Sequence, residues 1–245
     1  MIKAYARTDV GKARDLNEDS YYITTDQFQK LQLFILADGM GGCNAGDLAS
    51  SLALISAKSY IENNFENTPK DKENICKLIK SSMEYANMVV HEKSLENKNL
   101  DGMGTTLEVC LIYNNRVYIG HIGDSRVYRI RNDFIRKLTQ DHSYVQKLVQ
   151  EGTITKEEAE HHAKKNILMK ALGCNAYVEP DVMVKGFQKG DILIICSDGL
   201  TNMVNIDDIY NIVKDNFELA AKELIDLANQ NGGMDNITII TIKNL

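Results

Sequence analysis

The stretch GTTLEVCLIYNNRVYIGHIGDSRVYRIRNDFIRKL (residues 104–138) decides the fold class of this sequence. Its runs are rich in β-branched and aromatic residues, which are typical of strands. Three dipeptides divide the runs from one another: Asn114-Asn115, Gly123-Asp124 and Asn132-Asp133. Because Asn, Asp and Gly tolerate the conformations that reverse a chain, the pattern predicts an antiparallel meander.

Two helices are predicted on the N-terminal side of this meander, after the continuous apolar strand LQLFILAD (residues 31–38). We expect the first helix to begin at Asp47 as its N-cap. Its apolar face is expected to contain Leu48, Leu52 and Ile55. The second helix should follow Pro69, with apolar residues at helical spacings: Ile75, Ile79, Ala86 and Val90. Both helices should lie side by side on the sheet.

The C-terminal half also contains helices and strands in groups. TKEE (residues 155–158) matches a capping box, and NILMKAL (166–172) is expected to be helical up to Gly173. The strands DILIICSD (191–198) and DNITIITI (235–242) enclose a helical pair, predicted to begin at Asn205 and to end at Gly232. This grouping favours an α+β fold over a doubly wound parallel sheet.

The composition limits the possible classes of protein. The chain has 245 residues, 44% of them hydrophobic, and two prolines, so we expect one fully folded domain. Its apolar runs are shorter than the ~20 residues of a membrane span, and no signal-peptide pattern is present, which predicts a cytoplasmic protein. A net charge of -6 without a basic stripe argues against a nucleic-acid partner.

Four aspartates stand where predicted strands meet loops: Asp38, Asp124, Asp198 and Asp235. Any one of them could simply belong to a turn, because Asp-Gly and Gly-Asp are turn dipeptides. Asp38-Gly39, however, is followed by more glycine and a helix rather than by the partner strand of a hairpin. Glycine also lets a backbone carbonyl approach a ligand closely.

Carboxylates gathered at one edge would repel one another unless cations lie between them. The candidate ligands are all oxygens, which favours magnesium or manganese over zinc or copper. Two such ions about 4 Å apart can share a carboxylate and activate a water molecule. The glycine-rich GMGG and GMGTT match neither nucleotide-binding glycine pattern, and an acid before Gly39 would repel phosphates, so a nucleotide site is disfavoured.

Six motifs occur in order along the chain: RDLNED (14–19), ADGMGG (37–42), GMGTT (102–106), GDSR (123–126), SDGL (197–200) and Asp235-Asn236. Together they make the sequence resemble the metal-dependent type 2C protein serine/threonine phosphatases in their bacterial form, over essentially the whole chain. The resemblance implies a central β-sandwich of two antiparallel sheets flanked by pairs of helices. It also implies a centre of two manganese or magnesium ions and a weaker third ion.

The resemblance assigns a role to each acid of the motifs. Asp38 would bridge the two core ions, with Asp198 and Asp235 on one of them and the Gly39 carbonyl on the other. Three further acids would complete the site from outside: Glu18 through metal-bound water, Asp19 in support of Glu18, and Asp124 with Asp198 at the third ion. The implied reaction is hydrolysis of phosphoserine or phosphothreonine by a metal-activated water.

Arg14 is the predicted phosphate clamp, because a guanidinium presents paired donors to two phosphate oxygens. The alternative is a surface arginine near an acidic loop. Arg126 is expected to bind neighbouring acids rather than substrate. Five cysteines lack C-x-x-C spacing and are predicted to be reduced packing residues, with a raised thiol pKa near the motif acids: Cys43, Cys76, Cys110, Cys174 and Cys196.

The sequence departs from the family pattern at two places. Met40 stands where many eukaryotic relatives have a histidine general acid, so the proton for the leaving group must come from metal-bound water or another side chain. The sequence does not distinguish among four candidate histidines: His121, His142, His161 and His162. Each of them is more easily explained as structural. Residues 145–173 resemble the flap of bacterial members, but HHAKKN (161–166) replaces the familiar His-Pro-x-x-Asn form.

Three hypotheses follow. The first is a monomeric cytoplasmic phosphatase that acts on phosphoproteins and opposes a Ser/Thr protein kinase. The second is a phosphatase for one dedicated regulatory partner, which the lack of a fused sensor domain disfavours. The third is a non-catalytic phosphoprotein-binding module. Loss of a metal-binding acid would have favoured the third, and every acid of the motif set is present.

Overall fold

The computed structural model describes residues 1–24, 31–41 and 45–245. Its strands are β1 Ile2–Asp9, β2 Asp19–Ile23, β3 Gln32–Met40, β4 Gly104–Thr105, β5 Leu107–Tyr113, β6 Arg116–Ile122, β7 Arg126–Arg131, β8 Phe134–Lys137, β9 Asp181–Gly186, β10 Ile192–Cys196 and β11 Ile237–Asn244. Its helices are α1 Gly46–Phe65, α2 Lys72–Leu95, α3 Tyr144–Gln150, α4 Lys156–Glu160, α5 Asp198–Thr201, α6 Ile206–Asp215 and α7 Ala220–Gln230, with a 3-10 turn at Lys98–Leu100.

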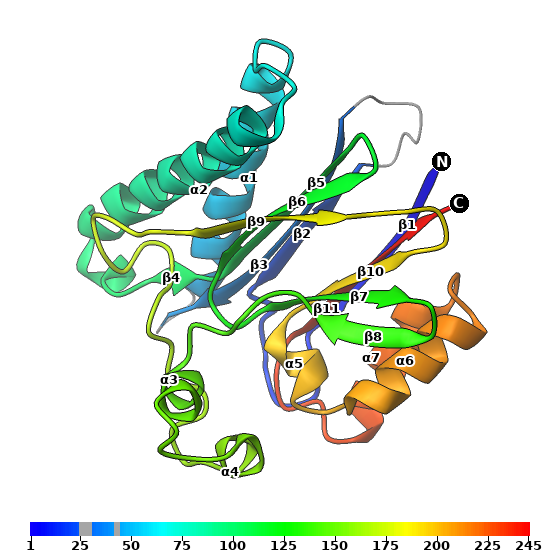
Figure 1. Cartoon of the computed structure of the whole chain (residues 1–245). Helices are drawn as coiled ribbons and strands as arrows, with labels where there is room; N and C mark the ends of the chain where they lie inside the picture. The colour runs from blue at the N-terminus through cyan, green and yellow to red at the C-terminus, as the bar shows by residue number, and fades with distance from the viewer. Residues whose placement is uncertain (25–30, 42–44) are drawn as a thin grey trace.

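Two antiparallel sheets form the centre of the molecule (Figure 1). One has the strand order β1-β11-β10-β7-β8, and the other has the order β2-β3-β5-β6-β9, with β4 added to β3. Helices α1 and α2 cover the second sheet, and α5, α6 and α7 lie on the side of the first (Figure 1). The predicted α+β sandwich of two antiparallel sheets with flanking helices is therefore confirmed.

Strand β3 shows why the apolar runs of this sequence are continuous. Phe34 and Leu36 point into the core between the two sheets, whereas Leu33, Ile35 and Ala37 point into the core beneath α1 and α2. All five side chains are at most 1% exposed. A strand buried on both faces has no polar side to alternate with its apolar one.

The two asparagine turns of residues 104–138 are confirmed. Asn114 and Asn115 have φ of 50° and 56° between β5 and β6, and Asn132 and Asp133 have φ of 47° and 64° between β7 and β8. Both central residues of each two-residue turn are left-handed, which matches the right-handed twist of a hairpin. Each pair of strands is accordingly antiparallel.

The prediction of one continuous meander is wrong at Gly123-Asp124. Strand β6 pairs with β5 and β9, while β7 pairs with β8 and β10 in the other sheet. The chain therefore crosses from one sheet to the other at this dipeptide. Gly123 has φ of 111°, and a Cβ there would lie 2.5 Å from a methyl carbon of Thr106, so the crossing requires glycine.

The predicted face of the first helix is also wrong. Helix α1 begins after Ala45, with Asp47 in its first turn, and Ile55 is 54% exposed. Leu48 and Leu52 are only partly buried at the side of the core. The fully buried positions are mostly small and bring the helix close to the sheet: Ala49, Ala53, Ala57 and Ile61. In α2 the predicted face is confirmed, since its four apolar residues are fully buried.

Residues 143–173 extend from the sandwich and carry α3 and α4 (Figure 1). Thr155 and Glu158 form the predicted capping box of α4. The predicted helix over residues 166–172 is wrong, because Leu168 and Leu172 form isolated β-bridges with Ser143 and Thr105. The Asn205 N-cap of α6 is confirmed, and α7 ends at Gln230, two residues before Gly232. In the described part of the chain, no helix combines the length and hydropathy needed to span a bilayer.

Candidate metal centre and active site

Asp38 lies near the end of β3 and is held by its backbone. The Thr106 backbone N–H and the Thr105 hydroxyl both donate to the Asp38 carbonyl over 2.9 Å. The Asp38 N–H donates to the Thr106 hydroxyl over 3.0 Å. In the register of β2 and β3, Asp19 lies opposite Asp38. These contacts fix the main chain of Asp38 without using its carboxylate.

Gly39 lies where β3 comes very close to the start of α1. Its N–H donates to the Glu18 carbonyl over 3.1 Å. A Cβ on Gly39 would lie 2.1 Å from the carbonyl oxygen of Gly46, so no other residue fits there without displacing the start of α1. The Glu18 carboxylate accepts from the Gly46 N–H over 3.2 Å. Glu18 is thus placed at the N-terminus of α1, beside Gly39.

The other sheet contributes Asp198 and Asp235 from neighbouring strands. Asp198 begins α5 two residues after β10, and Asp235 lies two residues before β11. Asn236 joins this edge to the segment of residues 10–18. Its side-chain amide donates to the carbonyls of Val10 and Leu16, each over 2.9 Å, and accepts from the Glu18 N–H over 2.8 Å.

The carboxylates of this edge repel one another. The pKa of Asp38 is raised well above its ordinary value of 3.8 by burial and then by the charges of four aspartates: Asp19, Asp198, Asp124 and Asp235. Burial is also the largest cause that raises the pKa of Asp19 to about 7, and the same holds for Asp124, whose pKa is about 7. All four aspartates predicted at strand ends therefore act on one another in a single region.

The residues of this region fit hard divalent cations. Among the described residues, Oδ1 of Asp19 is buried without a hydrogen-bond partner. The donors are all oxygens, which suits magnesium or manganese, and cations would remove the repulsion that raises these pKa values. Within residues 1–24, 31–41 and 45–245, no three Asp, Glu, His or Cys side chains already converge as ligands of one ion. The evidence that these residues suit divalent cations is therefore the unpartnered oxygen of Asp19 and the repulsion among the carboxylates.

Several acids have protein partners at present. Nη2 of Arg14 contacts Oδ2 of Asp235 over 3.0 Å, and the Arg14 side chain is 47% exposed. The Asn202 amide donates to Asp198 over 3.0 Å, and the Ser197 hydroxyl donates to Asp19 over 3.0 Å. Arg14 therefore stands at the solvent side of the acid cluster, as a phosphate clamp would require.

The region also contains residues that the sequence did not indicate. Thr106 and Ser125 share a buried hydrogen bond of 2.9 Å that joins the β3 edge to the Asp124 loop. The pKa of Asp198 is raised by burial and by Asp235, and the charge of Lys165 is among the weaker causes that lower it.

Two other expectations, for Arg126 and Cys196, agree with the structure. Arg126 binds Asp141 over 2.8 Å, so its predicted role with acids is confirmed. Cys196 is fully buried and burial raises its thiol pKa to about 12, as expected of a packing residue. Met40 lies at the end of β3 and is partly buried. Gly42 and Cys43 lie outside the described residues.

Comparison with known proteins decides the family. Residues 12–232 match the family model described as protein phosphatase 2C. The chain belongs to the protein phosphatase 2C family. The resemblance predicted from the six motifs is therefore confirmed.

Relatives within the protein phosphatase 2C family match along nearly the whole chain. The serine/threonine phosphatase stp of Listeria innocua is 39% identical over 245 residues, which cover 99% of this chain and 96% of the relative. The crystal structure of serine/threonine phosphatase Stp1 from Staphylococcus aureus superposes with a TM-score of 0.92 at 34% identity, covering 100% of this chain and 96% of that one. The catalytic domain of the phosphatase PstP, solved with two manganese ions, has a TM-score of 0.86 at 34% identity, covering 99% and 97%.

Proposed function

We propose that this member of the protein phosphatase 2C family hydrolyses phosphoserine and phosphothreonine in proteins and requires divalent cations. The observation that carries the proposal is the mutual repulsion of five aspartates at one edge of the sandwich. The names of the relatives, serine/threonine phosphatases, support the substrate class. PstP with its two manganese ions supports a centre of two cations.

The proposed cation ligands are the residues of this edge. Asp38 would be shared between two ions, Asp198 and Asp235 would help to hold one of them, and the Gly39 carbonyl would help to hold the other. Glu18 and Asp19 would support the centre from outside, and Asp124 with Asp198 would hold a weaker third ion. When bound, the cations supply charge neutralisation, polarisation of the phosphoryl group and a lowered pKa for a water molecule.

The chain's own residues orient the phosphoryl group. Arg14 exchanges its contact with Asp235 for the phosphate oxygens, where its paired donors neutralise the charge of the transition state. Met40 has no proton to donate to the leaving alkoxide. His121 is fully buried with its ring bonded to the Gln140 carbonyl, and the His142 ring accepts from the Gly123 N–H, so both rings already have protein partners.

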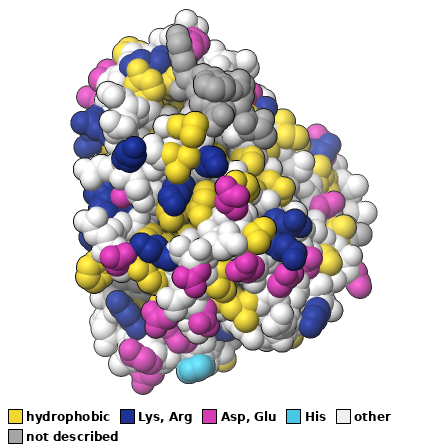
Figure 2. All heavy atoms as spheres, turned by 90° about the vertical axis from the view of Figure 1, so that its right-hand side faces the viewer, with side chains coloured by type: hydrophobic (Ala, Val, Ile, Leu, Met, Phe, Trp, Pro, Cys, Tyr) yellow, Lys and Arg dark blue, Asp and Glu magenta, His cyan; other side chains and the backbone are white. Residues whose placement is uncertain are grey.

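The proposed partners are phosphoproteins, including those phosphorylated by a Ser/Thr kinase. Figure 2 shows acidic and basic side chains interspersed on the face that it presents, without a continuous basic stripe across the side chains drawn. Such a face suits peptides and proteins better than a polyanionic backbone. A monomeric state, a cytoplasmic location and one catalytic unit over residues 1–245 with a flap at about 145–173 stay predictions.

The test is a turnover assay with a phosphothreonine peptide. We expect hydrolysis with Mn²⁺ or Mg²⁺ and none with excess chelator. Asp38→Asn should abolish turnover and keep the folded circular dichroism spectrum, because it removes the shared ligand and relieves repulsion. Asp226→Asn, which changes an exposed acid of α7, is the matched control and should retain full turnover. Turnover that persists in chelator, or in Asp38→Asn, would contradict the proposal.

A further inference from the structure

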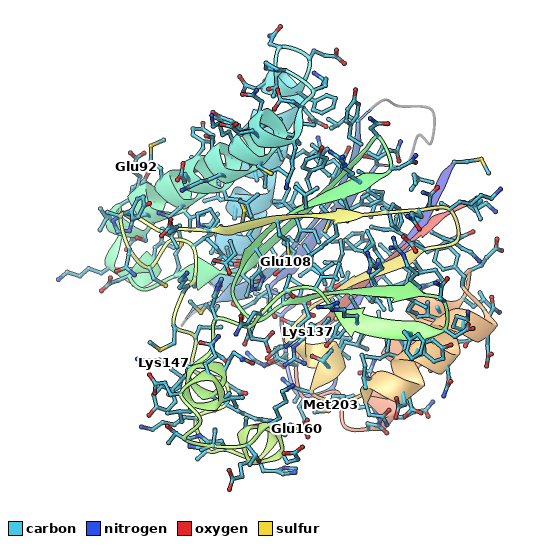
Figure 3. The ribbon with its side chains drawn as sticks, viewed as in Figure 1. Glu92, Glu108, Lys137, Lys147, Glu160 and Met203 are labelled. Carbon is cyan, nitrogen blue, oxygen red and sulfur yellow. The ribbon has the colours of Figure 1, made fainter. Side chains whose placement is uncertain are left out.

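A buried polar chain runs from the core between the sheets to the base of residues 143–173. It begins with Glu108 of β5 and His121 of β6, which lie opposite each other in the strand register. Both side chains are fully buried, and a Glu108 carboxylate oxygen is hydrogen-bonded to Nδ1 of His121. Figure 3 shows Glu108 between the two sheets. The proposed reaction uses neither residue.

The chain continues from His121 to the segment that precedes α3. Nε2 of His121 donates to the Gln140 carbonyl over 2.8 Å. The rings of His121 and His142 are stacked, with centroids 4.6 Å apart. His142 is in turn bound to Gly123, the residue next to Asp124. Its backbone N–H donates to the Gly123 carbonyl over 2.7 Å, and its Nδ1 accepts from the Gly123 N–H over 3.1 Å.

His142 also holds the far side of the same segment. Its Nε2 lies 3.3 Å from Oδ2 of Asp181, at the start of β9. Its carbonyl accepts from the Met169 N–H over 2.7 Å, so both ends of residues 143–169 meet at this one residue. The Tyr144 N–H donates to the Ile167 carbonyl over 2.8 Å beside it. His142 is therefore the point where the projecting segment joins the loop that carries Asp124.

The partners fix the proton positions on both rings. A backbone N–H can only donate, so Nδ1 of His142 carries no proton and its Nε2 carries the proton that faces Asp181. Burial and the charge of His121 lower the pKa of His142 to about 4, which keeps this neutral form. His121 faces two acceptors and donates from both nitrogens. Burial opposes its charge, but Glu108 outweighs burial and raises the pKa of His121 to about 9.

We propose that His121 and His142 are positioning residues that fasten residues 143–169 to the Gly123-Asp124 loop, and so hold the base of this segment beside Asp124. The hydrogen bonds of His142 to Gly123 and to Met169 join the two parts directly. When the fastening is removed, the segment separates from the loop while the two sheets stay intact. We expect this separation to weaken the binding of a phosphopeptide, and that kinetic consequence rests on the proposed function.

The test uses His142→Phe in the full chain, with His161→Phe on the exposed His161 as the matched control. Phenylalanine keeps a ring to stack on His121 but removes the two side-chain contacts of His142, with the Gly123 N–H and with Asp181, while the backbone bond to the Gly123 carbonyl remains. Because two hydrogen bonds are lost, trypsin should cleave at Lys164 and Lys165 about tenfold faster than in the wild type. KM for a phosphothreonine peptide should rise about tenfold, with kcat within about twofold.

His142→Asn is the second variant, because its amide oxygen can take the place of Nδ1 and accept from the Gly123 N–H. It should restore a cleavage rate within about threefold of the wild type, whether or not His142→Phe folds. Cleavage of His142→Phe at the wild-type rate, or equal acceleration in His142→Asn and His161→Phe, would overturn the proposal. Trypsin cleavage does not depend on catalysis. If the wild type showed no turnover, the proposed function would be contradicted, but the cleavage rates would still test whether His142 fastens the segment.

Discussion

Asp141 holds two cations in a partly buried cluster, and its removal should destabilise the protein strongly. Its side chain is 7% exposed. Oδ2 accepts from Nε and Nη2 of Arg126 over 3.0 and 2.8 Å, and Oδ1 accepts from Nζ of Lys137 over 2.9 Å. Asp141→Ala leaves both cations without their carboxylate while they stay largely covered.

Breaking a buried ion pair by removing one partner costs about 3–5 kcal/mol. The Arg126 and Lys137 side chains are 26% and 32% exposed, so they keep some hydration, and the lower end, about 3 kcal/mol, applies. For a chain of this size that corresponds to a fall in Tm of about 6–12 °C. Urea denaturation at neutral pH measures the free energy directly, and thermal unfolding gives Tm.

Asp226→Ala is the control for this measurement. Asp226 lies 3.7 Å from Lys222 on α7, and both side chains are more than half exposed, so its removal should cost less than about 0.5 kcal/mol. If Asp141→Ala lowers the unfolding free energy by no more than Asp226→Ala does, the reasoning about buried charge is refuted.

The pH dependence gives a second check on Asp141. Burial alone would raise its pKa, but the charges of Arg126 and Lys137 outweigh burial and leave the pKa below its ordinary value of 3.8. A depressed carboxylate pKa contributes stability that is fully present above the unfolded value and is lost as the pH falls through the folded value. The difference between wild type and Asp141→Ala should therefore be equal at pH 7 and pH 5 and should shrink below pH 3.8.

Three further predictions concern other parts of the molecule. Arg14→Ala should lower kcat/KM for a phosphothreonine peptide about 100-fold, and Arg14→Lys should restore only part of it, as steady-state kinetics will show. The pKa of His121 is raised from 6.5 to about 9, so its charge stabilises the fold fully below pH 6.5 and this stabilisation is lost as the pH rises towards 9; urea denaturation of the wild type should show that decline. Asn115→Val should destabilise the hairpin turn by about 1–2 kcal/mol in thermal unfolding, whereas Asn115→Gly should not.

Features that depend on local chemistry were predictable from the sequence. Asn115 reverses the chain because it tolerates a left-handed conformation, and Asn205 caps α6 because its side chain reaches the Asp208 N–H three residues on. The capping box at Thr155 is local in the same way. The strand-end aspartates stood out because four of them occur where predicted strands meet loops, although any one alone could belong to a turn.

Features that depend on distant contacts were not predictable. Gly123 has the same turn chemistry as Asn115, yet β6 finds its second partner in β9, some 60 residues on, and the chain leaves the sheet. Residues 166–172 have helical spacing, but Leu172 bonds to Thr105 instead. The helix α1 buries alanines rather than its larger Leu48 and Leu52, because small side chains permit the closest contact with the sheet.

The residues of the candidate site also differ in whether they depend on local chemistry or on distant contacts. Motif acids such as Asp38 and Asp198 are visible as residue types at strand ends. Their supports are not visible, because nothing in the spacing of Thr106 and Ser125, or of Gly123 and His142, indicates that these side chains meet. The strands β1, β2 and β9 were not predicted either, because their partly exposed residues lack a continuous apolar run.

The central claim is that the aspartates of this edge bind divalent cations. Crystals grown with manganese and measured at the manganese absorption edge test it most directly, because anomalous scattering locates the ions without reference to activity. Two strong peaks are expected beside the Asp38 carboxylate, one of them within reach of Asp198 and Asp235. A map with manganese peaks elsewhere, and with Asp235 still bound to Arg14 and no peak at Asp38, would contradict it.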